Sequence, residues 1–313
     1  MISITSQPDT SYFHWQNLVQ FKNLKDLNLL ENHRSIWLVQ RDKPVSKWLS
    51  AFKRAFPNNV FIYTDDRPYK HYIPTIKIHG IYRYLLQFPE DDNKDMFLFD
   101  SDVIFREAID LGQFTEPNTA YCSDTVGYLG WQYLKTKGED IVKAMASFMG
   151  ISLEEIIEQN DNSGGAQIYY KGIPNKVDYF KEIDELAPQL YDLMRNHPTY
   201  HDYEPKIQDW TAEMWAVLWL LWKRGVKTKV VDELDFTWAT DNISKWNSAK
   251  MLHMAGITST HKGKFYKGAY VGKSPFGESF DDVDSESICM KYVEYILATE
   301  TDPDLWQLTK ETI

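Results

Sequence analysis

The N-terminal third of the chain alternates between short apolar runs and longer segments whose apolar residues recur at helical spacing. Runs rich in β-branched and aromatic residues predict strands, and apolar residues three or four positions apart predict helices. The expected strands are 1–6, 35–40, 59–64 and 95–99, and the expected helices are 12–30, 45–56 and 72–88. Because strands alternate with helices, we expect a parallel sheet with helices on its faces, and ligands beyond the carboxyl ends of its strands.

The remainder of the chain has a less regular pattern. Helices are expected at 153–159, 178–196, 208–224 and 285–298, and strands at 166–170 and 227–231. Gly225 directly follows the helix expected over 208–224 and is expected to cap its end. The segment 232–277 is rich in Trp, Lys and Gly and is predicted to be largely loop. The pattern as a whole predicts an α/β fold with an irregular C-terminal half.

The composition is that of a folded protein. Of 313 residues, 43% are hydrophobic and 25% are charged, which excludes a disordered or fibrous chain. The 34 Lys and Arg residues against 45 Asp and Glu residues give a net charge of −11. Binding to bulk nucleic acid is therefore not expected, because no overall basic field attracts phosphates. Aromatic residues reach 15%, with 11 Trp, and such a surplus lines carbohydrate or nucleoside sites when it does not fill the core.

Two features of the sequence bear on cellular location. Cys122 and Cys289 are too few for a disulfide framework or a cysteine-rich zinc site, so they favour a reducing compartment. The N-terminus lacks the basic start and the apolar stretch of a signal peptide, and the longest apolar run, 214–222, is too short to span a bilayer. We therefore expect a cytoplasmic protein without a membrane span.

The strongest candidate for chemistry is Asp100-Ser101-Asp102, which ends an apolar run. Two carboxylates at the carboxyl edge of a strand offer hard oxygen ligands, which suit a Mg²⁺ or Mn²⁺ ion that bridges a diphosphate. A solvated acidic turn is the alternative interpretation of the same pattern.

Two further segments carry candidate polar residues. Asn162-Ser163-Gly164 precedes an expected strand, where small residues let a ligand approach the backbone and polar side chains can bind a sugar hydroxyl; a plain turn is the alternative. Asp209 and Glu213 lie four positions apart near a helix start and are expected to share a face. Because Glu213 precedes an apolar run, it is a candidate functional carboxylate, with a structural ion pair as the competing explanation.

The last candidates lie in the loop-rich region. His253 occurs in an apolar stretch, where a histidine is more often a core residue than a ligand. Gly256 follows it, and then Lys262, Lys264 and Lys267 occur among glycines. Such a basic loop could neutralise a leaving diphosphate, although an ordinary solvated surface fits the same residues.

Six short motifs occur in order along about residues 1–270. They are Ser11-Tyr12-x-x-Trp15-Gln16-x-x-Val19, Tyr72-Ile73-Pro74, Asp100-Ser101-Asp102-Val103-Ile104, Asn162-Ser163-Gly164, Trp210-x-x-Glu213-Met214 and His253-Met254-Ala255-Gly256. Each motif is weak alone, but six in one order rarely coincide by chance. Together they resemble a GT-A glycosyltransferase, and more narrowly the hydroxyproline O-arabinosyltransferase and peptidyl-serine galactosyltransferase group.

The resemblance implies a GT-A-like, Rossmann-type nucleotide-binding sheet that is flanked by helices. It also implies a single catalytic domain over 1–277, with a nucleotide-binding half at 1–105 and an acceptor-side half at 106–277. The segment 278–313 would then be a C-terminal helical extension.

The resemblance further implies transfer of arabinose or a hexose from a UDP-sugar to a hydroxyl acceptor, with retention of configuration. Asp102 and His253, helped by Asp100, would hold Mn²⁺ or Mg²⁺. Glu213 and Asp209 are the expected catalytic residues. Trp210 is expected to contact the acceptor. The expected donor contacts are Thr5, Ser6, Gln7, Trp15, Asp100, Asn162, Ser163, Gly164 and Lys262.

Alternatives remain open for the acceptor and for the class of activity. Because the enzymes of that group are anchored secretory proteins and this sequence begins at the expected catalytic sheet, a hydroxyproline-rich secreted acceptor is not expected. The acceptor classes that we expect are a glycan, a peptide hydroxyl or a modified nucleobase. A haloacid-dehalogenase-like phosphatase would use Asp100 as nucleophile and Asp102 as acid/base, but at least three expected strands precede these residues. A carbohydrate-binding protein without catalysis gives no reason for the set of acidic residues and His253.

Overall fold

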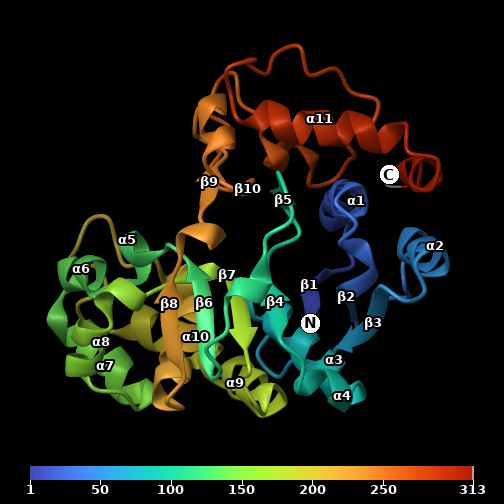
Figure 1. Cartoon of the computed structure of the whole chain (residues 1–313). Coiled ribbons are helices and arrows are strands. Elements are labelled where there is room, and N and C mark those ends of the chain that lie inside the picture. The colour runs from blue at the N-terminus through green and yellow to red at the C-terminus, as the bar shows by residue number, and fades with distance from the viewer. Residues whose placement is uncertain (312–313) are drawn as a thin grey trace. The chain divides into compact units, whose positions relative to one another are not determined.

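The computed structural model describes residues 1–311 and has an α/β fold (Figure 1). The strands are β1 (Ile2–Pro8), β2 (His33–Gln40), β3 (Val60–Asp65), β4 (Met96–Leu98), β5 (Val103–Phe105), β6 (Thr119–Ser123), β7 (Gly165–Lys171), β8 (Lys227–Val230), β9 (Phe236–Trp238) and β10 (Met251–His253). They form a seven-stranded sheet in the order β3-β2-β1-β4-β7-β6-β8 and a three-stranded sheet in the order β5-β10-β9. The expected α/β class is therefore confirmed.

The seven-stranded sheet is mixed, which corrects the expectation of a parallel sheet. β1 is parallel to β2, with Thr5 opposite Ser35, and β6 is parallel to β8. β7, however, is antiparallel to both β4 and β6. A long connection with helices of its own separates β6 from β7, so the chain can re-enter the sheet in either direction. The alternation of strands and helices in the sequence does not reveal the direction of β7.

The helices match most of the expected positions. They are α1 (Ser11–Asp26), α2 (Lys47–Ala55), α3 (Thr75–Gln87), α4 (Pro89–Asp92), α5 (Val126–Leu129), α6 (Trp131–Leu134), α7 (Glu139–Met149), α8 (Leu153–Glu158), α9 (Lys176–Asn196), α10 (Ala212–Lys223), α11 (Cys289–Glu300) and α12 (Trp306–Thr309). Within residues 1–311, no helix has both the length and the apolar character that crossing a membrane requires.

Local backbone chemistry explains why two of the expected helices end or begin at other residues in the structure. The helix expected from residue 12 to residue 30 ends at Asp26, because Asn28 adopts a left-handed conformation with φ of 58°. The helix expected from residue 72 begins at Thr75, because the residue before a proline disfavours the helical region and Arg67 binds the carbonyls of Tyr72 and Ile73 at 3.2 and 3.3 Å.

The chain folds into two compact units that interleave along the sequence. Unit 1 comprises Met1–Ile2, Asp65–Leu98 and Leu111–Leu234, and unit 2 comprises Ser3–Thr64, Phe99–Asp110 and the chain from Asp235 onward. The catalytic-domain boundaries expected at 105 and 277 stay a prediction.

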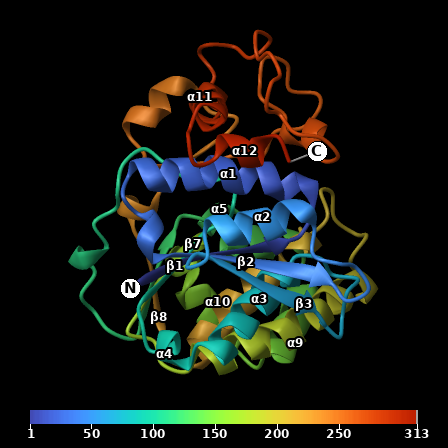
Figure 2. The ribbon, with the colours of Figure 1, turned by 90° about the vertical axis from the view of Figure 1, so that its right-hand side faces the viewer.

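Unit 2 is built around α1. Figure 2 shows α1 between the strands β1 and β2 and the helices α11 and α12. Trp15 and Val19 of α1 pack in one core with Tyr292 and Ile296 of α11, so residues from both ends of the sequence share this core. The three-stranded sheet also belongs to unit 2, and its strands β9 and β10 are short elements within 232–277, which is otherwise loop-rich as expected. β9 and β10 are each three residues long. Such strands are too short to show an alternation of apolar and polar residues in the sequence.

Unit 1 is centred on the nearly all-apolar helix α10. Trp215 and Trp219 are completely buried, as expected for a helix that is apolar on every side. α10 packs against α9, β7 and β8. Gly225 follows α10 with φ of 67°, which confirms its expected role as a C-cap.

Candidate functional site

The backbone of the turn that carries the two aspartates is held by α1. The side-chain amide of Gln20 donates to the carbonyl oxygens of Asp100 and Val103, at 2.8 and 3.3 Å. Asn23 donates to the carbonyl of Phe105 at 2.7 Å and accepts from its N–H at 2.8 Å. Two amide side chains of one buried helix face therefore determine where the carboxylates project.

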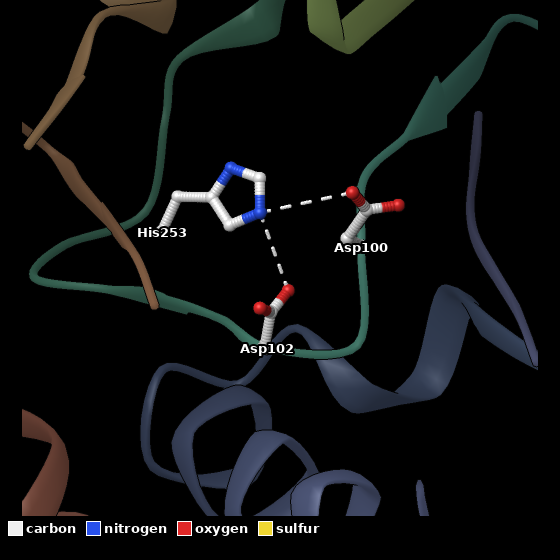
Figure 3. Close-up of side chains that lie close together, drawn as sticks. All are labelled: Asp100, Asp102 and His253. Atoms are coloured by element: carbon white, nitrogen blue, oxygen red, sulfur yellow. Dashed lines mark ion pairs between the residues drawn. The ribbon is translucent and has the colours of Figure 1, made fainter. Parts of the chain in front are cut away.

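Asp100, Asp102 and His253 come together in unit 2 (Figure 3). Nε2 of His253 lies 3.4 Å from Oδ1 of Asp102 and 3.7 Å from Oδ2 of Asp100. One ligand atom of each residue lies within 4.8 Å of the other two. A hydrogen bond of 3.1 Å from the N–H of Met254 to the carbonyl of Asp102 joins the end of β10 to the turn, and the ring of Trp238 stacks on His253.

The electrostatics of this cluster centre on Asp102. Asp102 is buried, whereas 34% of the Asp100 side chain is exposed. Burial raises the pKa of the Asp102 carboxyl, but the charges and hydrogen bonds of Lys267 and His253 outweigh burial and hold that pKa well below its usual range. Burial lowers the pKa of Lys267, but its ion pair with Asp102 outweighs burial and raises that pKa. Asp102 is therefore ionised, and Lys267 is protonated, at neutral pH.

The chemistry of this donor set fits a divalent cation. Two carboxylates and one imidazole are ligands that Mn²⁺ and Mg²⁺ accept, with Mn²⁺ more tolerant of the nitrogen. Two ligand atoms that each lie about 2.1 Å from an ion are at most about 4.2 Å apart. The distances of 3.4 and 3.7 Å from His253 to the two carboxylates fall within that limit.

The three lysines of the expected basic loop differ in their contact with this cluster. Lys262, the predicted donor contact, is exposed, and Lys264 donates to the carbonyls of Thr240 and Asp241. Lys267 is the lysine that pairs with Asp102. Each of the three lysines has a glycine beside it, so this feature of the sequence does not separate them.

Trp15 is a core residue in this structure. Its side chain is completely buried, and its indole N–H donates to the carbonyl of Tyr270 at 3.2 Å. Tyr270 ends the 3-10 helix Lys267–Tyr270. Trp15 therefore anchors the segment that begins with Lys267, and its predicted contact with the donor stays a prediction.

The polar residues of β1 lie among buried partners. Oγ1 of Thr5 lies 3.3 Å from Nε2 of His33. The side-chain amide of Gln7 donates to Oγ of Ser35 at 3.0 Å and to the carbonyl of Ile36 at 2.9 Å. Within the described part of the chain, Oγ of Ser6 and Oε1 of Gln7 are buried without a hydrogen-bond partner. Buried polar atoms of this kind require an explanation, and a bound ligand is one.

In unit 1, Glu213 is the second residue of α10 and is buried. Its Oε1 lies 3.3 Å from Nζ of Lys77. The hydroxyl of Tyr72 accepts from the N–H of Glu213 at 2.9 Å and donates to the carbonyl of Trp210 at 2.7 Å. Tyr72 therefore fixes the start of α10, while the side chain of Trp210 is 58% exposed.

Asp209 has partners of its own. It lies in the 3-10 helix Asp209–Thr211 that precedes α10, so the helix expected over 208–224 begins in a tighter geometry. Its Oδ2 accepts from the hydroxyl of Tyr200 at 2.6 Å and lies 3.8 Å from Nε of Arg195. Asp209 and Glu213 thus make separate interactions.

The Asn162-Ser163-Gly164 segment is tightly packed within unit 1. The side-chain amide of Asn162 donates to Oε1 of Gln159 at 3.1 Å, and Ser163 is buried. A Cβ atom on Gly164 would lie 2.3 Å from Cβ of Cys122 and 3.1 Å from Cγ2 of Val230. Packing within the protein therefore accounts for the glycine at 164 without a ligand.

The comparisons with known proteins give only distant similarities. No protein-family model and no curated protein matches the sequence. The galactosyltransferase LgtC, solved in complex with donor and acceptor sugar analogues, aligns with a TM-score of 0.49 and 13% identity, over 99% of this chain and 100% of LgtC. The WbbM bifunctional glycosyltransferase aligns with a TM-score of 0.47 and 13% identity, over 99% of this chain and 51% of WbbM.

A third structure is a glycosyltransferase involved in the glycosylation of the major capsid of PBCV-1. It aligns with a TM-score of 0.33 and 11% identity, over 70% of this chain and 93% of that chain. This chain spans about half the length of WbbM. Because the identities and the TM-scores are low, the residues of the site, and not these similarities, support the function proposed below.

Proposed function

We propose that the chain is a metal-dependent glycosyltransferase that moves a sugar from a UDP-sugar to a hydroxyl acceptor. The observation that carries this proposal is the convergence of Asp100, Asp102 and His253, whose ligand atoms lie within 4.8 Å of one another. These three residues come from two distant parts of the sequence, and they are the three that the sequence motifs nominate as metal ligands.

In this proposal Asp102, His253 and Asp100 hold Mn²⁺ or Mg²⁺. A divalent ion bound there would stabilise the negative charge on the diphosphate as it leaves the sugar. Lys267, which pairs with Asp102, brings a further positive charge to the neighbourhood of the diphosphate. Ser6 and Gln7, each with a buried polar atom that lacks a partner, support a donor site near the end of β1. We retain Thr5, Trp15, Asn162, Ser163, Gly164 and Lys262 as proposed donor contacts.

The finer features concern the reacting sugar. We propose arabinose or a hexose as the transferred group, with retention of configuration. Glu213 would stabilise the positive charge that develops at the anomeric carbon, and Asp209 would bind a sugar hydroxyl. The exposed indole of Trp210 offers an apolar wall to a glycan, a peptide or a modified nucleobase as acceptor. We also propose a cytoplasmic location, in keeping with two free cysteines.

The phosphatase alternative lacks support in the structure. Three strands, β1 to β3, precede β4, the strand that ends just before Asp100, as expected from the sequence. A carbohydrate-binding function without catalysis gives no reason for this cluster.

Calorimetry with UDP and Mn²⁺ tests the proposal. Asp102→Ala removes a ligand, so we expect the affinity for UDP with Mn²⁺ to fall by about thirtyfold or more, the effect of truncating one member of a buried charge pair. His253→Ala should weaken binding less, because both carboxylates remain. Asp281→Ala is the control, since Asp281 is exposed and its carboxylate accepts from Ser279. Unchanged affinity in Asp102→Ala would contradict the metal assignment.

A further inference from the structure

Asp102, a proposed metal ligand, already has a cation of its own chain bound to it. Nζ of Lys267 pairs with Oδ2 of Asp102, while Oδ1 of the same carboxylate faces His253 at 3.4 Å. Asp102 is buried, so its charge requires a partner whenever no metal ion is present. Lys267 supplies that partner.

The backbone around Lys267 is anchored, but its side chain can move. The carbonyl of Tyr270 accepts from Trp15 at 3.2 Å, and the carbonyl of Val271 accepts from the hydroxyl of Ser11 at 3.0 Å. Both bonds attach the 3-10 helix that begins at Lys267 to α1. The ammonium sits on a flexible four-carbon stem, so it can leave Asp102 without a shift of this backbone. A fifth of the Lys267 side chain is exposed, which leaves it an outward path.

We propose that Lys267 is an internal counter-ion that competes with the divalent metal for Asp102 and makes metal binding depend on an anionic ligand. A metal ion at Asp102 repels the ammonium at the same carboxylate, so the two cations exclude each other there. An anion that enters gives the displaced ammonium a new charged partner, and the diphosphate of the proposed donor is such an anion. This inference rests on the proposed function.

The competition has a thermodynamic consequence. Metal alone must break the Lys267–Asp102 ion pair, so it binds weakly. Metal together with UDP offers the ammonium a new partner, so the two ligands strengthen each other's binding. Because this coupling is reciprocal, it can be measured from either ligand.

The first experiment measures Mn²⁺ affinity by calorimetry without nucleotide, at fixed pH and ionic strength. Lys267→Met removes the competing charge and keeps the length of the side chain, so we expect it to bind Mn²⁺ about tenfold more tightly than the unsubstituted protein. Lys267→Arg keeps the charge and should bind Mn²⁺ as the unsubstituted protein does. Lys273→Met is the matched control, because Lys273 lies in the same segment but pairs with Glu278 at 3.0 Å.

The second experiment measures how far UDP strengthens Mn²⁺ binding. We expect this coupling to be large in the unsubstituted protein and about tenfold smaller in Lys267→Met. Without metal, Lys267→Met should also melt at a lower temperature, because Asp102 loses its partner, and Mn²⁺ should restore the melting temperature. Lys267→Gln gives the same comparison if Lys267→Met does not fold.

The outcomes separate this inference from the proposed function. If Lys267→Met binds Mn²⁺ alone no more tightly than the unsubstituted protein, while both bind UDP with Mn²⁺, Lys267 is no competitor and only this inference is wrong. If the unsubstituted protein and every variant fail to bind Mn²⁺ even with UDP, the inference and the proposed metal site are both wrong.

Discussion

At the scale of single residues, two buried carboxylates have the same kind of partner. Asp102 and Glu213 are each 5% exposed, and each pairs with a lysine, Lys267 and Lys77 respectively. A buried carboxylate without a partner is costly, so removal of one member of such a pair lowers stability whatever other role the carboxylate has. For Glu213, a catalytic role and a structural ion pair therefore predict different effects of substitution.

We expect Glu213→Gln to lower kcat by roughly two orders of magnitude, because it removes a charge that stabilises the reacting sugar, while UDP affinity stays nearly unchanged. Lys77→Met is the matched control, since it breaks the same ion pair of 3.3 Å from the other side. Steady-state kinetics and thermal melting of both variants provide the test. If both variants melt lower and keep their turnover, Glu213 is only a structural partner of Lys77.

At the scale of elements, the junction before β7 shows why a glycine is needed. The register of β7 against β6 shifts between Cys122 and Ser123, and the segment before β7 approaches β6 closely. A Cβ on Gly164 would lie 2.3 Å from Cβ of Cys122. Two carbon atoms of different side chains do not approach each other so closely in folded proteins. The spacing between strands therefore selects glycine at this position.

We expect Gly164→Ala to lower the free energy of unfolding by about 1–3 kcal/mol, the usual cost of overpacking a core. Gly127→Ala is the control, because Gly127 lies in α5 and a Cβ there would meet no atom within 4 Å. Its helical position should make the control neutral or up to about 1 kcal/mol stabilising. Denaturant unfolding measures both. A Gly164→Ala protein of full stability with lost UDP affinity would instead favour a ligand contact.

At the scale of the whole molecule, a buried histidine makes stability depend on pH. His33 at the start of β2 is completely buried, with Nδ1 3.0 Å from Oγ of Ser3 and Nε2 3.3 Å from Oγ1 of Thr5. Burial lowers the pKa of His33 to about 3, with a smaller contribution from the charge of Arg34. The folded protein therefore keeps His33 neutral at a pH where the unfolded chain protonates it.

The sign of this effect follows from the lowered pKa. The contribution of His33 to stability is complete above the unfolded pKa of about 6.5 and is lost as the pH falls from there toward 3. Between pH 6 and pH 4.5 we expect a loss of up to about 1.4 kcal/mol per pH unit. Denaturant unfolding at several pH values measures it. His33→Asn should flatten the dependence, and the same change at exposed His261 should not. An unchanged slope in His33→Asn would contradict the assignment.

Much of the N-terminal fold could be predicted because periodicity is a local property. Apolar spacing located β1 to β4 and α1 to α3 within a few residues. Asp100 and Asp102 were also predictable as candidates, because two carboxylates that follow an apolar run differ from ordinary turn chemistry. His253 was harder to identify, because β10 contributes only three residues and its partners β5 and β9 lie elsewhere in the sequence.

The sequence by itself determined the α/β class, most helix positions and the candidacy of Asp100 and Asp102, since each depends on residue types and spacings within a few turns of chain. Tertiary structure alone decided the direction of β7, the packing reason for Gly164 and the pairing of Lys267 with Asp102. Lys267 and Asp102 stand 165 positions apart. Their pairing depends on how Trp15 and Gln20 of α1 hold the two segments, and such burial and anchoring energies belong to the folded chain and leave no local pattern in the sequence.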